Sequence, residues 1–115
     1  MDTRDSVLRD YLAKLIVAGP PVAIVLFGSQ ATGQAGPDSD FDFCVIEHDL
    51  AMEVNPPARR DRYWRALRPR TAPVDLLVYA QSEFARAYHD GWSVPQEIVQ
   101  KGIWLHGSPR SVGIA

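Results

Sequence analysis

Residues 26–47 read LFGSQATGQAGPDSDFDFCVIE, and this stretch decides how the rest of the chain is interpreted. An apolar segment ends at Gly28 and Ser29. After a loop rich in turn residues, a second apolar segment begins with Asp40 and Asp42 at alternate positions. Carboxylates are poor strand residues and are costly to bury. Their position therefore indicates either an exposed turn or a site where positive charge meets them.

Length and composition predict one globular domain over residues 1–107, followed by a flexible tail over residues 108–115. The net charge of −2 argues against a stand-alone nucleic-acid-binding domain and makes stable nucleic-acid binding an unlikely role. The longest apolar run, residues 22–27, is too short to span a bilayer, and the charged first ten residues lack a signal-peptide pattern. The single cysteine, Cys44, cannot form an internal disulfide. We therefore expect a cytoplasmic protein without a membrane partner.

Apolar spacing and turn residues predict strands that alternate with helices. Strands are expected over residues 22–27, 41–47 and 73–80, with an edge strand at residues 103–107. Helices are expected over residues 7–16 and 59–68, at a segment opened by Ser82, and at a segment opened near Ser93, with Gln96 in a capping-box position, and closed by Gly102. This order predicts an α/β or α+β fold around a small sheet.

The alternation of side chains along a strand places the carboxylates. Asp40 and Asp42 share a face with Cys44 and lie about 6–7 Å apart along the strand. Asp75 interrupts the third strand near its start in the same way, with no basic neighbour in the strand. Three carboxylates on two strands repel one another unless a cation joins them. Oxygen ligands without a nearby His or Cys pair suit Mg²⁺ or Mn²⁺.

Each motif also has a plainer interpretation. A bare Asp-x-Asp is more often a solvated strand end, and Gly28-Ser29 alone is more often a plain turn. The order of these motifs, a strand followed by Gly28-Ser29 and then by two carboxylates at the start of the next strand, favours a functional site. A glycine admits a close ligand, and the free N–H groups of a helix start suit a phosphate. Two ions held by shared carboxylates are a recurring device for phosphoryl and nucleotidyl transfer.

Together, LFGSQATG, PDSDFDFCV and PVDLLVY resemble the minimal nucleotidyltransferase family of the DNA polymerase β-like superfamily. The resemblance covers roughly residues 22–79 and implies the nucleotidyltransferase fold, a small mixed β-sheet flanked by helices. It implies that Gly28 and Ser29 hold the triphosphate. It also implies that Asp40 and Asp42 bind two Mg²⁺ or Mn²⁺ ions, and that Asp75 binds the catalytic ion and helps to deprotonate the acceptor hydroxyl.

The activity implied by this resemblance is metal-dependent transfer of a nucleoside monophosphate, AMP from ATP foremost, to a hydroxyl acceptor. Some small members act as antitoxins beside a helical HEPN-like toxin, either by modifying it or by binding it. The alternative to an enzyme is therefore a non-catalytic antitoxin-type partner that keeps the fold. Many members carry basic residues after the Gly-Ser pair, where this chain has Gln30 and Thr32. Two positive charges beside the triphosphate are lost, which lowers the expected nucleotide affinity and the expected activity.

The remaining polar and aromatic residues are expected to have structural or surface roles. Six of the twelve basic residues fall within residues 59–70, which favours a solvated helix face over a site for an acidic partner. The three histidines lack ligand spacing, Cys44 is expected in the core, and the three tryptophans are expected to cover core or edge. The sequence leaves open the acceptor, the preferred base and the oligomeric state.

Overall fold

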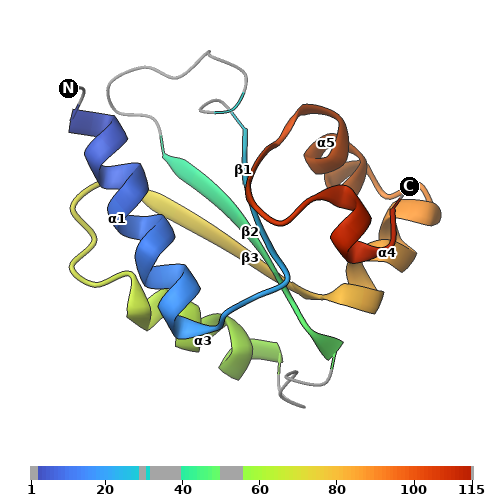
Figure 1. Ribbon diagram of the computed structural model, residues 1–115, viewed down its shortest axis with the longest axis horizontal. Helices are drawn as coiled ribbons and strands as arrows, with labels where there is room; N and C mark the ends of the chain where they lie inside the picture. The colour runs from blue at the N-terminus through green and yellow to red at the C-terminus, as the bar shows by residue number, and fades with distance from the viewer. Residues whose placement is uncertain (1–2, 29–30, 32–39, 50–55, 115) are drawn as a thin grey trace.

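The computed structural model describes residues 3–28, 31, 40–49 and 56–114. These residues form a four-stranded mixed β-sheet with helices on both faces (Figure 1). In chain order the elements are α1 (Thr3–Ala18), β1 (Ala23–Phe27), β2 (Phe41–Glu47), α3 (Pro56–Ala66), β3 (Val74–Ala80), α4 (Gln81–His89), α5 (Ser93–Lys101), β4 (Ile103–His106) and the 3-10 helix η2 (Pro109–Val112). The predicted α+β class is confirmed.

The strands lie in the order β3-β2-β1-β4. β1 is antiparallel to both β2 and β4, whereas β2 and β3 are parallel. The inner strands β1 and β2 are buried along most of their length, which explains their nearly continuous apolar sequence. β4 lies at an edge, as predicted. Because β1 runs opposite to its neighbours, its carboxyl end lies beside the amino ends of β2 and β3.

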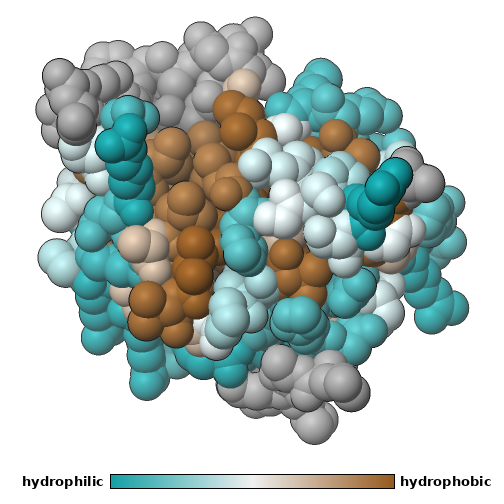
Figure 2. Space-filling view, viewed as in Figure 1, coloured by the Kyte–Doolittle hydropathy of each residue, from teal (hydrophilic) through white to brown (hydrophobic). Residues whose placement is uncertain are grey.

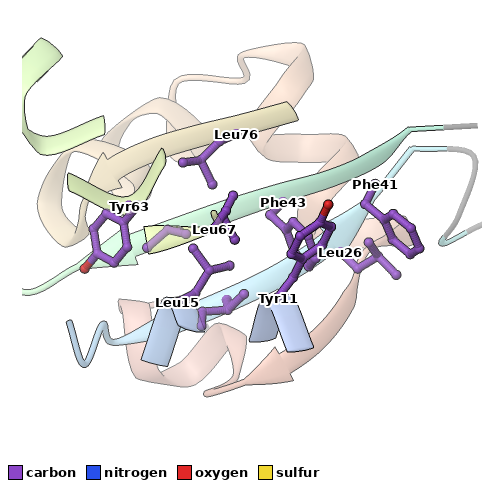
Figure 3. Packing of buried hydrophobic residues seen from close by; sticks show 10 residues of the cluster. Tyr11, Leu15, Leu26, Phe41, Phe43, Tyr63, Leu67 and Leu76 are labelled. Carbon is purple, nitrogen blue, oxygen red and sulfur yellow. The ribbon is translucent and has the colours of Figure 1, made fainter. Parts of the chain in front are cut away.

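One face of the sheet packs against α1 and α3. Phe41 and Phe43 of β2 point to this face and surround Tyr11 of α1, whose ring centroid lies 6.0 Å and 6.1 Å from theirs. Figure 3 shows these rings beside Leu26, with Tyr63 of α3 and Leu67, which directly follows α3, farther along the same face. The alternation predicted for β2 is therefore confirmed on this side.

The other face packs against α4, α5 and η2. Cys44 and Ile46 of β2 point to this face and meet Phe84 of α4 and Ile98 of α5. Figure 1 shows α4 and α5 on the side of the sheet opposite to α1 and α3. Asp42, two positions before Cys44, belongs to this second face.

The C-terminal segment corrects the prediction of a flexible tail. Residues 109–112 form η2, and the hydroxyl of Ser108 accepts a hydrogen bond from the N–H of Ser111. Val112 and Ile114 are only 1% and 3% exposed and pack among the apolar side chains of the second face. Two isolated apolar residues among Gly, Ser and Arg gave no recognisable period, so their burial was not visible in the sequence.

The helix starts after β3 also differ from expectation. α4 begins at Gln81, before Ser82, and the N–H of Ala80 is capped by the Glu83 carboxylate at 3.1 Å. Ser93 is the first residue of α5 and not its cap. Gln96 donates its side-chain N–H to the carbonyl of Tyr88 and so ties α5 to α4. Gly102 ends α5, as predicted.

The surface of the molecule carries a continuous apolar band beside α1 (Figure 2). Val17, near the end of α1, is the most exposed large apolar side chain in the described part of the chain. None of the helices described in the structure is long and apolar enough to cross a membrane.

Candidate active site

The edge where β1 ends and β2 and β3 begin brings three predicted site residues together. Asp42 is in register with Phe27 of β1 and with Asp75 of β3. Gly28 directly follows Phe27. Gly28, Asp42 and Asp75 thus lie across three neighbouring strands, on residues that are 14 to 47 positions apart in the chain.

Gly28 lies directly against the carboxylate of Asp42. Its φ angle is +73°, a conformation that side-chain-bearing residues rarely adopt. A Cβ atom on Gly28 would lie 2.5 Å from Oδ2 of Asp42, which is closer than such atoms can approach. The backbone turns after Gly28, whose carbonyl accepts a hydrogen bond from the N–H of Ala31 at 3.1 Å. Because Gly28 has no side chain, its backbone can lie directly against the Asp42 carboxylate.

The other loop residues of the prediction are outside the described part of the chain. These are Ser29, the second predicted phosphate-binding residue, and the two positions of the departure from the family, Gln30 and Thr32.

The electrostatic environment of Asp42 favours its neutral form. Partial burial raises the pKa of Asp42, and the nearby charges of Asp75 and Asp40 raise it further, in that order of size. An ionised Asp42 is thus opposed by two carboxylates and by poor solvation. A cation placed among the three groups would relieve this cost.

Asp75 has a partner that the sequence did not reveal. Its carboxylate lies 3.6 Å from the Arg60 guanidinium of α3, whose Nε donates to the carbonyl of Leu76 at 3.0 Å. The N–H of Leu76 also donates to the Asp75 carboxylate, at 2.8 Å. Asp75 and Arg60 are both largely exposed, so this ion pair contributes little stability and can be displaced easily. The strand itself supplies no basic neighbour, as the sequence indicates, but Arg60 reaches Asp75 from α3.

The donor set fits a divalent cation in chemistry, although its side chains do not form a closed cage. Only carboxylate oxygens are present, as Mg²⁺ and Mn²⁺ prefer. Within the described ranges, no three His, Cys, Asp or Glu side chains converge well enough to hold an ion as they stand. Asp40 is exposed just before β2, and Asp75 points partly toward Arg60. Binding an ion here therefore requires these carboxylates to turn toward Asp42.

The remaining polar candidates have structural surroundings. Cys44 is fully buried, and burial raises the pKa of its thiol. His106 lies in β4 and its Nε2 is 3.1 Å from the carbonyl oxygen of Pro21. Trp104 is partly buried, whereas Trp92 is 67% exposed and does not cover the core as expected.

Comparison with known proteins places the chain beside nucleotidyltransferases. A family model for the nucleotidyltransferase domain matches residues 6–105. A provisionally assigned nucleotidyltransferase from Sulfolobus solfataricus has 19% sequence identity and a TM-score of 0.61; the alignment covers 86% of this chain and 76% of that one. A toxin-antitoxin structure with AMP-PNP has 22% identity and a TM-score of 0.58, over 90% and 76% of the two chains. No curated protein sequence matches this chain.

Proposed function

Because the chain belongs to the nucleotidyltransferase domain family, we propose that it transfers a nucleoside monophosphate, AMP from ATP foremost, to a hydroxyl acceptor. The observation that carries this proposal is the in-register pair Asp42 and Asp75 beside Gly28. Burial and the charge of Asp75 raise the pKa of Asp42, and such perturbed carboxylates cluster at functional sites.

Asp75 is proposed to accept the proton of the acceptor hydroxyl. The acceptor oxygen then forms a bond to the α-phosphorus of the nucleotide, and the bond from that phosphorus to the bridging oxygen breaks. Pyrophosphate leaves with the bonding electrons. The exposure of Asp75 suits this role, because an acceptor can reach it directly from solvent.

Asp40 and Asp42 are proposed to hold Mg²⁺ or Mn²⁺ as a pair of ions, with Asp75 as a further ligand of one of them. When bound, these ions neutralise the charge of the phosphates and of the leaving pyrophosphate. Asp42 is held by two strand ladders, so its backbone is fixed while Asp40 and Asp75 adjust. Release of Asp75 from Arg60 costs little free energy, because the ion pair between them is exposed.

Gly28 and Ser29 are proposed to contact the triphosphate, because Gly28 at the carboxyl end of β1 has no side chain and lets a ligand approach the backbone closely. An adenine nucleotide is supported by the AMP-PNP of the toxin-antitoxin neighbour. Gln30 and Thr32 supply no positive charge, so we expect weak nucleotide affinity in the absence of the acceptor.

A non-catalytic antitoxin-type role is the second candidate. It is supported by the likeness to a toxin-antitoxin structure and by exposed apolar side chains at the start of α5, Trp92 and Val94. In this role the chain binds a HEPN-like helical protein and blocks it by occupancy. The cytoplasmic location stays a prediction.

The enzymatic proposal is tested by incubating the protein with α-labelled ATP, Mg²⁺ and candidate acceptor proteins. We expect label on the acceptor with the wild type and none with Asp42→Asn. Asp10→Asn is the matched control, since Asp10 is an exposed carboxylate of α1 paired with Lys14. Transfer that persists in Asp42→Asn would contradict the assignment. Tight binding of a helical partner without any transfer, unaffected by Asp42→Asn, would favour the second candidate.

Nucleotide binding is tested separately by thermal denaturation. ATP with Mg²⁺ should raise the melting temperature of the wild type, because a ligand that binds only the folded state stabilises it. Asp40→Asn should abolish this rise and leave the metal-free melting temperature unchanged. A large fall in the metal-free melting temperature would instead show that Asp40 is structural.

A further inference from the structure

Arg60 of α3 holds the Asp75 carboxylate through a closed set of contacts. Nη2 of Arg60 lies 3.6 Å from Oδ1 of Asp75, and Nε of Arg60 donates to the carbonyl of Leu76 at 3.0 Å. The N–H of Leu76 donates to the same Oδ1 of Asp75 at 2.8 Å. Arg60, Asp75 and the backbone of Leu76 therefore contact one another pairwise. We call this set of three residues the β3 clip.

The β3 clip lies at the outer edge of the sheet, away from Asp42. β3 is an outer strand, and its paired side faces β2, which carries Asp42. Figure 3 shows the Leu76 side chain on the face that packs against α1 and α3, so Asp75, the preceding residue, leaves the opposite face. α3 covers the Leu76 face (Figure 1). Arg60 thus reaches Asp75 around the outer edge of β3 and holds the carboxylate toward that edge.

The guanidinium of Arg60 supplies positive charge to the empty site. Partial burial and the charges of Asp75 and Asp40 oppose an ionised Asp42. A cation held against Asp75 offsets part of this repulsion. To share a metal ion with Asp42, however, the Asp75 carboxylate has to turn away from the outer edge. Arg60 and the ion therefore compete for one carboxylate.

The ion pair of the β3 clip is weak enough to be exchanged. The side chains of Arg60 and Asp75 are 45% and 63% exposed, and their separation of 3.6 Å exceeds the length of a charge-assisted hydrogen bond, about 2.7–2.9 Å. The Arg60 guanidinium also lies 5.0 Å from the centre of the Trp64 ring. This ring remains a favourable neighbour for the guanidinium after it leaves Asp75.

We propose that Arg60 is the counter-ion of Asp75 in the empty protein and gives way to a divalent cation when the site fills. This inference rests on the proposed metal-dependent transfer and concerns the regulation of its site. Arg60 lowers the affinity for a free ion. The site then fills best when an ion arrives with a nucleotide, whose phosphates supply further oxygen ligands.

The β3 clip also has a plainer interpretation. The backbone of an outer strand can pair with another chain, and side chains that occupy its N–H and C=O groups prevent this. In that case Arg60 and Asp75 only cover the backbone of Leu76. This interpretation predicts that the loss of Arg60 leaves metal affinity unchanged, whereas the exchange predicts that metal affinity rises.

The exchange is tested by titrating Mn²⁺ alone into the protein and measuring free Mn²⁺ by electron paramagnetic resonance. Arg60→Gln should tighten Mn²⁺ binding about threefold to fivefold, the effect of one exposed ion pair. Arg60→Lys should lie between the wild type and Arg60→Gln, because it keeps the charge but loses the Nε donor to Leu76. Asp42→Asn should abolish the binding, which identifies the site that is measured.

The matched control is Arg65→Gln, which removes an exposed arginine of α3 that pairs with Asp61. It changes the net charge by the same amount without contacting Asp75, and should bind Mn²⁺ as the wild type does. Equal or weaker Mn²⁺ binding by Arg60→Gln would overturn the proposal. An equal gain in Arg65→Gln would also overturn it, because the effect would then come from net charge alone.

A second measurement follows the β3 clip in the wild type and needs no variant. Because the N–H of Leu76 donates to Asp75, its NMR resonance should shift when Mg²⁺ is added and Asp75 turns toward the ion. The N–H of Ala72, which donates to the Tyr11 hydroxyl, should keep its position. A Leu76 resonance that is unchanged at saturating Mg²⁺ would show that the β3 clip stays closed and would overturn the proposal.

These measurements separate the role of Arg60 from the proposed function. Absence of Mn²⁺ binding in the wild type and in both Arg60 variants would count against metal-dependent transfer, and this inference would fall with it. Mn²⁺ binding that requires Asp42 but is unchanged in Arg60→Gln would count against the role of Arg60 alone.

Discussion

Asp42 of β2 and Asp75 of β3 stand at the same register position of two parallel strands, so both side chains leave the same face of the sheet. The pair is kept at a cost, because like charges close together repel one another, most strongly where they are partly removed from water. Burial is the larger cause of the raised pKa of Asp42, and the charge of Asp75 is the next. An ionised Asp42 is therefore unfavourable in the empty protein, and a cation bound between the two carboxylates would remove this cost.

The first prediction concerns stability of the metal-free protein. The pKa of Asp42 is raised above its ordinary value of 3.8, so its contribution to stability is present below that pH and is lost as the pH rises through the folded-state pKa. At pH 7 the ionised side chain is unfavourable. In EDTA, Asp42→Asn should therefore raise the free energy of unfolding at pH 7 by up to about 1 kcal/mol, a modest gain because the group is only partly buried.

Urea denaturation measured at several pH values checks this prediction. The gain from Asp42→Asn should shrink as the pH is lowered toward 3.8, since wild-type Asp42 then becomes protonated. Asp10→Asn, on the exposed surface of α1, should show no such gain. A loss of stability in Asp42→Asn at pH 7 would mean that the carboxylate makes a favourable contact in the empty site.

The second prediction concerns Gly28. Gly28→Ala adds a Cβ atom where Oδ2 of Asp42 lies and forces a side-chain-bearing residue to a φ of +73°. We expect a loss of about 1–2 kcal/mol in the free energy of unfolding from the backbone conformation. The Mg²⁺-dependent rise in melting temperature with ATP should also be lost, because the Asp42 carboxylate is displaced. Gly91→Ala is the matched control: its φ is +84°, but a Cβ atom there meets nothing within 4 Å. It should lose stability while keeping the rise with ATP.

The third prediction concerns the C-terminal segment. Val112→Ala should lower the free energy of unfolding by about 2 kcal/mol, because this side chain is buried on the second face of the sheet. Val17→Ala makes the same chemical change at a side chain that is 84% exposed, and should change stability by less than about 0.5 kcal/mol. Equal effects of the two substitutions, measured by chemical denaturation, would show that residues 108–114 do not pack in solution.

The fourth prediction concerns buried charge at the far end of β2. Glu47 is 2% exposed, pairs with Arg62, and accepts a hydrogen bond from the Tyr63 hydroxyl at 2.8 Å. Glu47→Ala should cost about 2–3 kcal/mol, because it leaves the buried Tyr63 hydroxyl without its acceptor and removes the carboxylate partner of Arg62, whose side chain is 37% exposed. Tyr63→Phe should cost only about 1 kcal/mol, the value of a single hydrogen bond. Thermal and urea denaturation measure both; a smaller cost for Glu47→Ala than for Tyr63→Phe would contradict this account.

The fifth prediction concerns the single thiol. Burial raises the pKa of Cys44, so almost no thiolate forms at pH 8, and the side chain is closed to reagents. Reaction with a thiol-specific reagent should be slow in the native state and rapid in urea. A native rate equal to that of the unfolded chain would show that β2 opens readily.

The strands and the faces of the carboxylates could be predicted because both follow from local patterns. Successive side chains of a strand point to opposite faces of the sheet, and residues 41–47 follow this alternation strictly. Phe43 therefore packs on one face and Cys44 on the other. The glycine at the end of β1 was also visible, since an apolar run that ends in glycine marks a turn. The roles assigned to Asp40, Asp42, Asp75, Gly28 and Ser29 stay predictions.

Features that depend on distant segments could not be predicted. Arg60 lies on a helix 15 residues before Asp75, and nothing local distinguishes it from its basic neighbours. Four of the eleven residues of α3 are arginines, which favoured a solvated surface. Arg59 and Arg62, however, reach carboxylates at the other end of the sheet. The segment that leads from α3 into β3 is likewise tied to α1 by a hydrogen bond from the Tyr11 hydroxyl to the Ala72 carbonyl, a contact across 61 residues.

β2 is joined to an antiparallel neighbour on one side and a parallel neighbour on the other. One residue added or removed within residues 41–47 would either break both ladders or turn Asp42 toward the side of Phe41 and Phe43. Among length variants of this chain, those that keep nucleotide binding should therefore carry their insertions and deletions outside residues 41–47.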